Sequence, residues 1–441
     1  MLPMNVSKHG VVISLRFTLA LLLLIGSGQT SLLFASEILR VGVGLITASG
    51  KARAGVEEVI SRFEKQYPKA KVELITLYDE EFKAAIIPWL RRKPDKNVPD
   101  IFFGSAGERL YNLVRKNYVE DITEVWQQHK LDQVFSPGIK ATVSFNSKVY
   151  AIPFAYYQWG FYYNSAVLAK YHLSLPKTWK QFLDICYTLK KHNIYCIGIG
   201  NKENWPAAGW FDYLNLRLNG LDFHRELTKG CIAYTHPSVR RVFDHWAELV
   251  HQGFYHPGAR NHNWKLVFPP IYRGKTAFTL IGNFAESLFG KIPPNIKENI
   301  KFIKFPEMTT NMPIYEDAPT DIFFLSKAAA NKKYAKKFMA FLATKEVQEL
   351  LTDGLSMIPI NREAKPKNTY FLREGKKLLD QAVGYAQFYD RDTPQNMADK
   401  GIRIFSQFIE DGNVEKAISD LEAARNRFYI GVHTPKNCNP L

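Results

Sequence analysis

Hydrophobic positions along the chain alternate repeatedly between two spacings. Segments 37–45 (EILRVGVGL) and 72–77 are short and apolar, which is typical of strands buried in a sheet. Between them, segment 55–67 places apolar residues three and four positions apart, the spacing of an amphipathic helix, and Pro68 ends it. The opening of the chain therefore predicts strand, helix and strand in succession.

The same alternation continues through most of the sequence. Further strands are expected at 100–104, 195–200 and 277–282. Further helices are expected over 80–90, 108–116, 178–191, 237–253, 376–388, 399–411 and 414–427. Thr178 is placed to cap its helix. Repeated strand–helix alternation predicts an α/β fold in which helices cover a sheet, followed by a helical C-terminal segment.

The N-terminus has the pattern of a secretory signal. Lys8 and Arg16 precede the apolar run 17–26 (FTLALLLLIG), and small residues follow it. The run is too short for a comfortable membrane span. We expect residues 1–35 to be a signal peptide, and the mature chain to be soluble in the periplasm. No cysteine precedes Cys186, so a lipid anchor on an N-terminal cysteine is not expected.

Four cysteines follow, at positions 186, 196, 231 and 438. Export permits disulfides. Cys186 and Cys196 fall on an expected helix and the strand after it, so a bridge between them is geometrically conceivable. Four thiols allow three complete pairings, and the sequence does not choose among them. The spacing is not that of a zinc site, and we expect neither a metal nor a cofactor.

The net charge is +16, or +14 without Lys8 and Arg16. The basic residues are scattered along the sequence, and no nucleic-acid-binding module accompanies them. We therefore expect no nucleic-acid partner. The charge indicates a soluble surface with some attraction to anionic membranes or polymers.

Aromatic and polar residues together provide the main functional signal. No GxSxG, HExxH or P-loop pattern indicates catalysis. Segment 204–213 (NWPAAGWFDY) follows the expected strand 195–200, the place where α/β folds bind ligands. A sugar needs rings to stack on and a few hydrogen-bonding side chains. Trp205, Trp210 and Asp212 are therefore candidate sugar contacts.

Several segments resemble one family in order and spacing. They are 100–110 (DIFFGSAGERL), 150–154 (YAIPF) with 162–164 (YYN), 176–179 (PKTW), 321–327 (DIFFLSK), 338–342 (FMAFL) and 346–348 (EVQ). Together they are similar to segments of extracellular solute-binding proteins of sugar ABC importers, the family that contains maltose-binding protein. The resemblance spans about residues 37–427.

This resemblance implies a two-lobed periplasmic-binding-protein fold with discontinuous lobes and a hinge. The first lobe would comprise 37–155 plus 325–365 and the second 156–318 plus 366–430, with 431–441 as a tail. The resemblance also implies further ligand contacts near the crossovers and strand ends. These are Glu108, Arg109, Tyr157, Trp159, Trp264, Asn283, Asp321, Arg391 and Asp392.

The expected function is reversible capture of a mono- or oligosaccharide in an interlobe cleft by a monomer that delivers it to ABC importer membrane subunits. Two alternatives stay open. Adjacent tyrosines at 156–157 and 162–163 are compatible with a receptor for ferric ion or an anion. Two carboxylates meeting in the cleft would instead make a secreted glycosidase.

Overall fold

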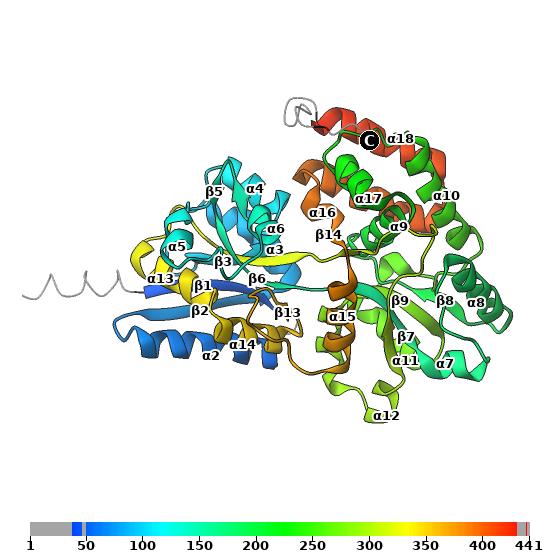
Figure 1. Cartoon of the computed structure of the whole chain (residues 1–441), viewed down its shortest axis with the longest axis horizontal. Helices are drawn as coiled ribbons and strands as arrows, with labels where there is room; N and C mark the ends of the chain where they lie inside the picture. Colours follow the sequence, from blue (N-terminus) through cyan, green and yellow to red (C-terminus); the bar gives the residue numbers. More distant parts are fainter. Residues whose placement is uncertain (1–37, 46–49, 430–437, 439–441) are drawn as a thin grey trace, which may run out of the picture.

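The protein forms two α/β bodies that lie side by side, as Figure 1 shows. A computed structural model describes residues 38–45, 50–429 and 438. The first lobe is built on a six-stranded sheet of order β13-β6-β12-β3-β1-β2, and the second lobe on a four-stranded sheet of order β10-β7-β9-β8. The α/β architecture expected from the alternating pattern is confirmed.

In the first lobe, β1, β2 and β3 are parallel, and β12 runs antiparallel between β3 and β6. The sheet strands are β1 (Ile38–Leu45), β2 (Lys71–Tyr78), β3 (Ile101–Ser105), β6 (Ala151–Tyr156), β12 (Thr320–Leu325) and β13 (Ile358–Pro359). The helices are α2 (Lys51–Gln66), α3 (Asp79–Leu90), α4 (Glu108–Arg115), α5 (Thr123–Gln128), α6 (Pro137–Thr142), α13 (Lys332–Leu342) and α14 (Lys345–Leu355). A short hairpin joins β4 (Ser144–Phe145) to β5 (Lys148–Val149).

In the second lobe, β8 and β9 are parallel, and β7 lies antiparallel to both β9 and β10. The strands are β7 (Trp159–Asn164), β8 (Tyr195–Gly198), β9 (Thr276–Gly282) and β10 (Ile300–Ile303). Its α-helices are α7 (Ser165–Lys170), α8 (Trp179–Lys191), α9 (Pro206–Thr228), α10 (Pro237–His251), α11 (Phe268–Tyr272), α12 (Pro294–Lys297) and α15 (Tyr370–Gln381). Short 3₁₀ helices are η1 (Ala259–Asn261), η2 (Trp264–Val267) and η3 (Asn283–Lys291).

Three C-terminal helices complete the second lobe: α16 (Tyr389–Asp392), α17 (Gln395–Asp411) and α18 (Val414–Tyr429). They pack on α9 and α10, as Figure 1 shows. Stacked Phe211 and Phe405, with ring centroids 4.4 Å apart, lie in this contact between α9 and α17. The expected helical C-terminal segment is confirmed.

The chain passes between the two sheets after β6, before β12 and after β13. Beside these crossings, β11 (Tyr315–Asp317) pairs in parallel with β14 (Gly384–Ala386). The predicted helix over 376–388 is therefore wrong beyond α15. Pairing with β11 draws residues 384–386 into extended backbone. Gly384 lets this strand lie against α9, because a Cβ at this position would lie 2.6 Å from the Leu221 side chain.

Two local predictions about α8 are confirmed. Thr178 caps this helix in a capping box with Gln181, whose side chain accepts from the Thr178 backbone. Cys186 of α8 and Cys196 of β8 form a disulfide, which is the bridge that their positions on a helix and the next strand allow. A second disulfide joins Cys231 to Cys438.

The predicted signal peptide lies outside the described residues, as does the predicted tail except for Cys438. Among the helices that are described, none combines the length and the apolar character needed to cross a membrane.

Candidate functional site at the junction of the lobes

Strand ends place the candidate residues at the junction of the two lobes. The carboxyl ends of β8 and β9 share one edge of the second sheet because these strands are parallel. The carboxyl ends of β1, β2 and β3 share an edge of the first sheet for the same reason. Ligands in α/β proteins bind outside such carboxyl ends. The segments that follow these strands are therefore the parts of the chain to inspect.

Aromatic rings from five segments of the second lobe meet at this junction, and we call them the aromatic junction. They are Trp159, Trp205, Trp264, Phe284 and Phe388. Trp205, which immediately precedes α9, is part-exposed and lies edge-on to Trp159 at 5.9 Å between centroids. Trp264 of η2 contacts Phe284 at 5.1 Å.

Two indole N–H groups within this cluster lack an acceptor in the described part of the chain. The Nε1 atoms of Trp159 and Trp205 are buried and have no hydrogen-bond acceptor among the residues that the structure describes. A buried N–H is costly to leave unpaired. The cluster thus combines flat apolar surfaces with donors suited to a ligand hydroxyl.

Arg391 of α16 joins the aromatic junction to the first lobe. Its guanidinium pairs with the Asp321 carboxylate of β12 at 2.9 Å and donates to the Thr320 carbonyl at 2.9 Å. It also donates to the hydroxyl of Tyr157 at 2.5 Å. The Tyr157 ring in turn lies edge-on to Phe284 at 5.2 Å. A guanidinium group is planar, always charged and rich in N–H donors, so it can bond several acceptors at once.

Burial changes the acid–base behaviour of this network. It raises the pKa of Asp321 to about 6, although the Arg391 guanidinium opposes the shift. Burial also raises the pKa of Tyr157, so its phenol stays protonated at neutral pH. The Asp79 carboxylate adds to both shifts, which places this residue of α3 close to the network.

The first lobe presents charged groups to the same junction. Asp79 pairs with Lys83 at 2.6 Å, and Glu80 pairs with the same ammonium at 3.1 Å. The side chain of Lys265, next to Trp264, lies over the half-exposed ring of Tyr78 at 6.0 Å. This contact spans the two lobes.

Glu108 and Arg109, at the start of α4, also lie at the junction. Arg109 pairs with Asp390 of α16 at 2.5 Å and donates to Gln395 at 3.3 Å. Glu108 pairs instead with Arg115 on its own helix at 2.6 Å.

The helices α4 and α16 approach closely because Gly107, with φ of 71°, has no side chain. A Cβ at this position would lie 2.5 Å from the Arg391 carbonyl oxygen. Asp392 accepts from the Gln387 backbone at 3.1 Å, and burial raises its pKa to about 6. The start of α4 thus reaches the residues around Arg391 and Asp392.

Two of the predicted residues lie in the interior of the second lobe. Trp210 is fully buried among Phe161, Tyr255 and Phe305. Asp212 is fully buried and accepts from the Tyr389 backbone at 2.8 Å. On a helix, five residues turn the side chain of Trp210 about 140° away from that of Trp205. Asp212 shares the helix face of Trp205 but lies about two turns further along α9, where it is covered by Tyr389.

Asn283 directly follows β9 and is fully buried. Its amide donates to the Ser356 carbonyl at 2.8 Å, and its backbone N–H donates to the Gln158 carbonyl at 3.1 Å. It therefore ties the end of β9 to the first lobe and to the crossing after β6.

Sequence reasoning missed four residues that the structure brings to the junction: Phe284, Phe388, Asp79 and Asp390. Asp79 follows β2 and Phe284 follows β9 by two positions, so the strand-end rule could have found both. Phe388 and Asp390 immediately precede or lie in α16, whose return to the junction depends on the β11–β14 pairing. No short-range pattern signals that pairing.

The surroundings of Tyr157 and Tyr162 do not favour the alternative of a ferric-ion receptor. Tyr162 is fully buried and surrounded by the rings of Phe268, Phe289, Phe302 and Phe371. Burial raises its pKa and that of Tyr157, which disfavours the phenolates that iron would need. Tyr157 is moreover engaged by Arg391.

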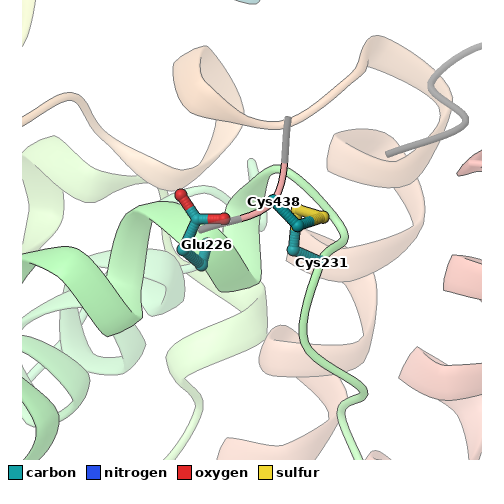
Figure 2. A group of neighbouring side chains, drawn as sticks. All are labelled: Glu226, Cys231 and Cys438. Atoms are coloured by element: carbon teal, nitrogen blue, oxygen red, sulfur yellow. A yellow bond between two sulfur atoms is a disulfide. The ribbon is translucent and has the colours of Figure 1, made fainter. Parts of the chain in front are cut away.

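One group of potential metal ligands lies away from the junction and is drawn in Figure 2. Glu226, Cys231 and Cys438 come together near the end of α9. The two sulfurs are bonded to each other, so neither is a thiolate, and Glu226 pairs with Lys229 at 2.6 Å. Disulfide sulfurs are poor metal ligands. The Cys231–Cys438 bond therefore serves to link the segment after α9 covalently to the C-terminal segment.

The fold and its interlobe site define a two-lobed solute receptor. The bacterial solute receptor AcbH, whose structure was reported with an exclusive preference for β-D-galactopyranose, has a similar fold with TM-score 0.79 and 23% identity, covering 88% of this chain and 98% of that one. A chitin oligosaccharide binding protein has TM-score 0.78 and 20% identity, covering 89% and 99%. The predicted two-lobed fold is confirmed.

The chain belongs to the family of bacterial extracellular solute-binding proteins, whose model matches residues 47–349. An uncharacterized ABC transporter extracellular-binding protein of Pyrococcus horikoshii is 25% identical over 74% of this chain and 72% of its own length. The multiple sugar-binding protein of Streptococcus mutans is 21% identical over 68% and 70%. The family resemblance inferred from the sequence is confirmed, and its members are receptors for solutes.

Proposed function

We propose that this protein is the substrate-binding component of an ABC importer and binds a mono- or oligosaccharide between its lobes. The observation that carries the proposal is the aromatic junction beside the Arg391 network. Rings of Trp205 and Trp264 offer apolar faces to sugar C–H groups. Arg391, Asp321 and the free indole N–H groups offer hydrogen bonds to hydroxyls.

The proteins that this chain resembles support a sugar as the bound solute. Two proteins of similar structure are a receptor with a preference for galactopyranose and a chitin oligosaccharide binding protein. A protein of similar sequence is a multiple sugar-binding protein. Polar groups buried at the junction would then set specificity, because a mismatched sugar leaves them unpaired.

The proposal includes export and assembly. Residues 1–35 serve as a signal peptide, and the mature chain works as a soluble monomer in the periplasm, without a lipid anchor, cofactor or nucleic-acid partner. The closed form docks on the membrane subunits. The lobes are 37–155 plus 325–365 and 156–318 plus 366–430, and the pairing of β12 with β3 and β6 supports adding 320–324 to the first lobe.

A thermal-shift screen tests the solute class. A ligand that binds only the folded state raises the melting temperature. We expect a galactoside, chitin oligosaccharide, malto-oligosaccharide or raffinose-type sugar to raise it. A shift produced by amino acids, polyamines, phosphate esters or ferric ion, with none from any sugar, would overturn the proposal. Turnover of chromogenic glycosides would indicate the glycosidase alternative.

A further inference from the structure

The first lobe has a basic end on the side away from the junction. Because β1, β2 and β3 are parallel, their first residues lie at one edge of the sheet, and β12 ends at that edge because it is antiparallel to β3. The connections that lead into β2 and β3 and out of β12 therefore gather there, at the left of Figure 1. We define the basic end as residues 65–71, 91–96, 116 and 327–333.

The connection from α2 to β2 contributes three exposed lysines: Lys65, Lys69 and Lys71. It contacts α13, since Lys337 lies over the Tyr67 ring at 4.7 Å. The connection is thus held against the helix that contributes Lys333.

The connection from α3 to β3 contributes the exposed residues Arg91, Arg92, Lys93 and Lys96. Its exposed carboxylate, Asp95, pairs with Arg92 at 2.7 Å. The other three cations have no ion-pair partner within the described ranges. This connection therefore carries a net positive charge.

The third contribution comes from residues around Lys116 and Lys327, both exposed. They lie together because the Lys327 backbone donates to the Tyr118 carbonyl at 2.8 Å. Here Glu120 offsets part of the charge, since it pairs with Lys332 at 2.9 Å and with Lys327 at 3.4 Å.

The fold thus sorts charges that look scattered in the sequence. At the opposite edge of the same lobe, the carboxylates of Asp79, Glu80 and Glu108 are paired with Lys83 and Arg115. One end of the lobe is basic, and the end facing the junction holds these carboxylates. A surface with this charge distribution is attracted, and oriented, by a plane of negative charge.

We propose that the basic end binds the headgroups of an anionic phospholipid bilayer. Clusters of several Lys and Arg side chains are sufficient for such binding. The described chain also enters the fold at this end, because Ile38 is paired with Lys71. Membership of an extracellular family favours a bilayer over a nucleic acid.

Co-sedimentation with vesicles tests this surface. One sample uses equimolar phosphatidylglycerol and phosphatidylcholine, and the other uses phosphatidylcholine alone. The test variant carries Lys65→Gln, Lys69→Gln, Lys93→Gln and Lys96→Gln. The matched control removes the same charge from exposed lysines of the second lobe, with Lys170→Gln, Lys190→Gln, Lys191→Gln and Lys275→Gln.

We expect the unchanged protein to bind only the anionic vesicles and to lose binding as salt is raised. The test variant should bind at least about tenfold more weakly, and the control should stay within about twofold of the unchanged protein. Equal losses in both variants, or no dependence on phosphatidylglycerol, would overturn the proposal. So would tighter binding of random-sequence DNA than of anionic vesicles in the same buffer.

Sugar-induced thermal shifts of the same samples separate this proposal from the proposed function. The substituted lysines lie away from the aromatic junction, so the shift should be equal in all three proteins. A protein that binds vesicles but no sugar would contradict only the proposed function. A protein that binds sugar but no vesicles would contradict only the membrane surface.

Discussion

Arg391 is the residue at which the polar contacts of the two lobes converge. It belongs to α16, which packs with the second lobe, yet its acceptors Thr320 and Asp321 belong to β12 of the first lobe. Tyr157, the third partner, lies on the crossing between β6 and β7. A buried guanidinium is stable only while these partners are in place. The contact geometry between the lobes therefore depends on this side chain, and under the proposed function sugar binding would depend on it as well.

Two tryptophans on the same stretch of chain should behave differently. Trp205→Phe removes a part-exposed indole and its N–H from the aromatic junction. Trp210→Phe alters the interior of the second lobe. We expect Trp205→Phe to weaken sugar affinity by about tenfold, which is about 1.4 kcal/mol. Trp210→Phe should leave the affinity unchanged and lower stability by about 1–3 kcal/mol.

Titration calorimetry and thermal melts on both variants check this pair. A loss of affinity in Trp210→Phe as large as that in Trp205→Phe would contradict the placement of the site. Each variant is the control for the other, because the same atoms are removed.

Asp321 should make stability depend on pH in a defined direction. Burial raises its pKa in the folded protein to about 6, above the ordinary aspartate value of 3.8. The folded state therefore holds this proton more tightly than the unfolded state between those two values. The contribution to the free energy of unfolding is largest below about pH 4 and is lost as pH rises through about 6, by at most about 3 kcal/mol.

Urea unfolding across this pH range, with Asp321→Asn as the comparison, measures the effect. The unchanged protein should lose stability relative to the variant as pH rises. Parallel pH profiles for the two proteins would show that Asp321 is not the group responsible.

At the scale of elements, strand direction accounts for both the junction and the basic end. Parallel strands gather the segments after them at one edge and the segments before them at the other. Helix α8 shows how local signals fix individual elements. Thr178 and Gln181 form its capping box, and Cys186 bonds it to β8.

Loss of the two disulfides should lower stability by different amounts. The Cys186–Cys196 bond spans 10 residues and the Cys231–Cys438 bond spans 207. A cross-link that closes a longer loop restricts the unfolded chain more, so paired Cys→Ser replacement should cost about 3 kcal/mol at the first bond and about 5 kcal/mol at the second. Denaturant unfolding of the two double variants gives the order. A larger loss at the shorter loop would show that strain or residual structure, not loop closure, dominates.

At the scale of the whole molecule, the described arrangement is one in which the lobes touch. Arg109 of the first lobe pairs with Asp390 of the second, and Lys265 lies over Tyr78. Hinge closure in two-lobed receptors is an equilibrium that such contacts bias. We therefore expect contacts between the lobes to contribute to solute affinity without touching the solute.

Removal of the Arg109–Asp390 pair should shift this equilibrium toward open forms. We expect Arg109→Ala to increase the radius of gyration of the sugar-free protein in small-angle scattering and to weaken sugar affinity several-fold. Arg240→Ala is the control, because it removes an exposed ion pair with Glu415 inside the second lobe. If both variants scatter alike and bind sugar equally well, the pair does not hold the lobes together.

Much of the architecture was predictable because it depends on short-range chemistry. Alternating hydrophobic spacings predicted β1, β2, β3, β8 and β9 and several of the helices that cover the two sheets, and Thr178 marked the start of α8. They did not predict the antiparallel strands β6, β7, β10 and β12 or the long helix α9. Part of the site was also predictable, since Asn283 directly follows β9 and Trp205 lies in the segment between β8 and α9. The helix predicted over 376–388 failed because a distant partner, β11, imposes extended backbone on 384–386.

The sequence by itself determined the types of most elements that it predicted, the order of the two α/β sections and the presence of aromatic residues near the end of β8. Only the tertiary structure decided which of those aromatics face the junction, because rotation along α9 separates Trp205 from Trp210. Only the tertiary structure brought Arg391 to Asp321 and gathered scattered lysines at one end of the first lobe. These contacts join residues far apart in the chain, and hydrophobic spacing, a local property, carries no information about them.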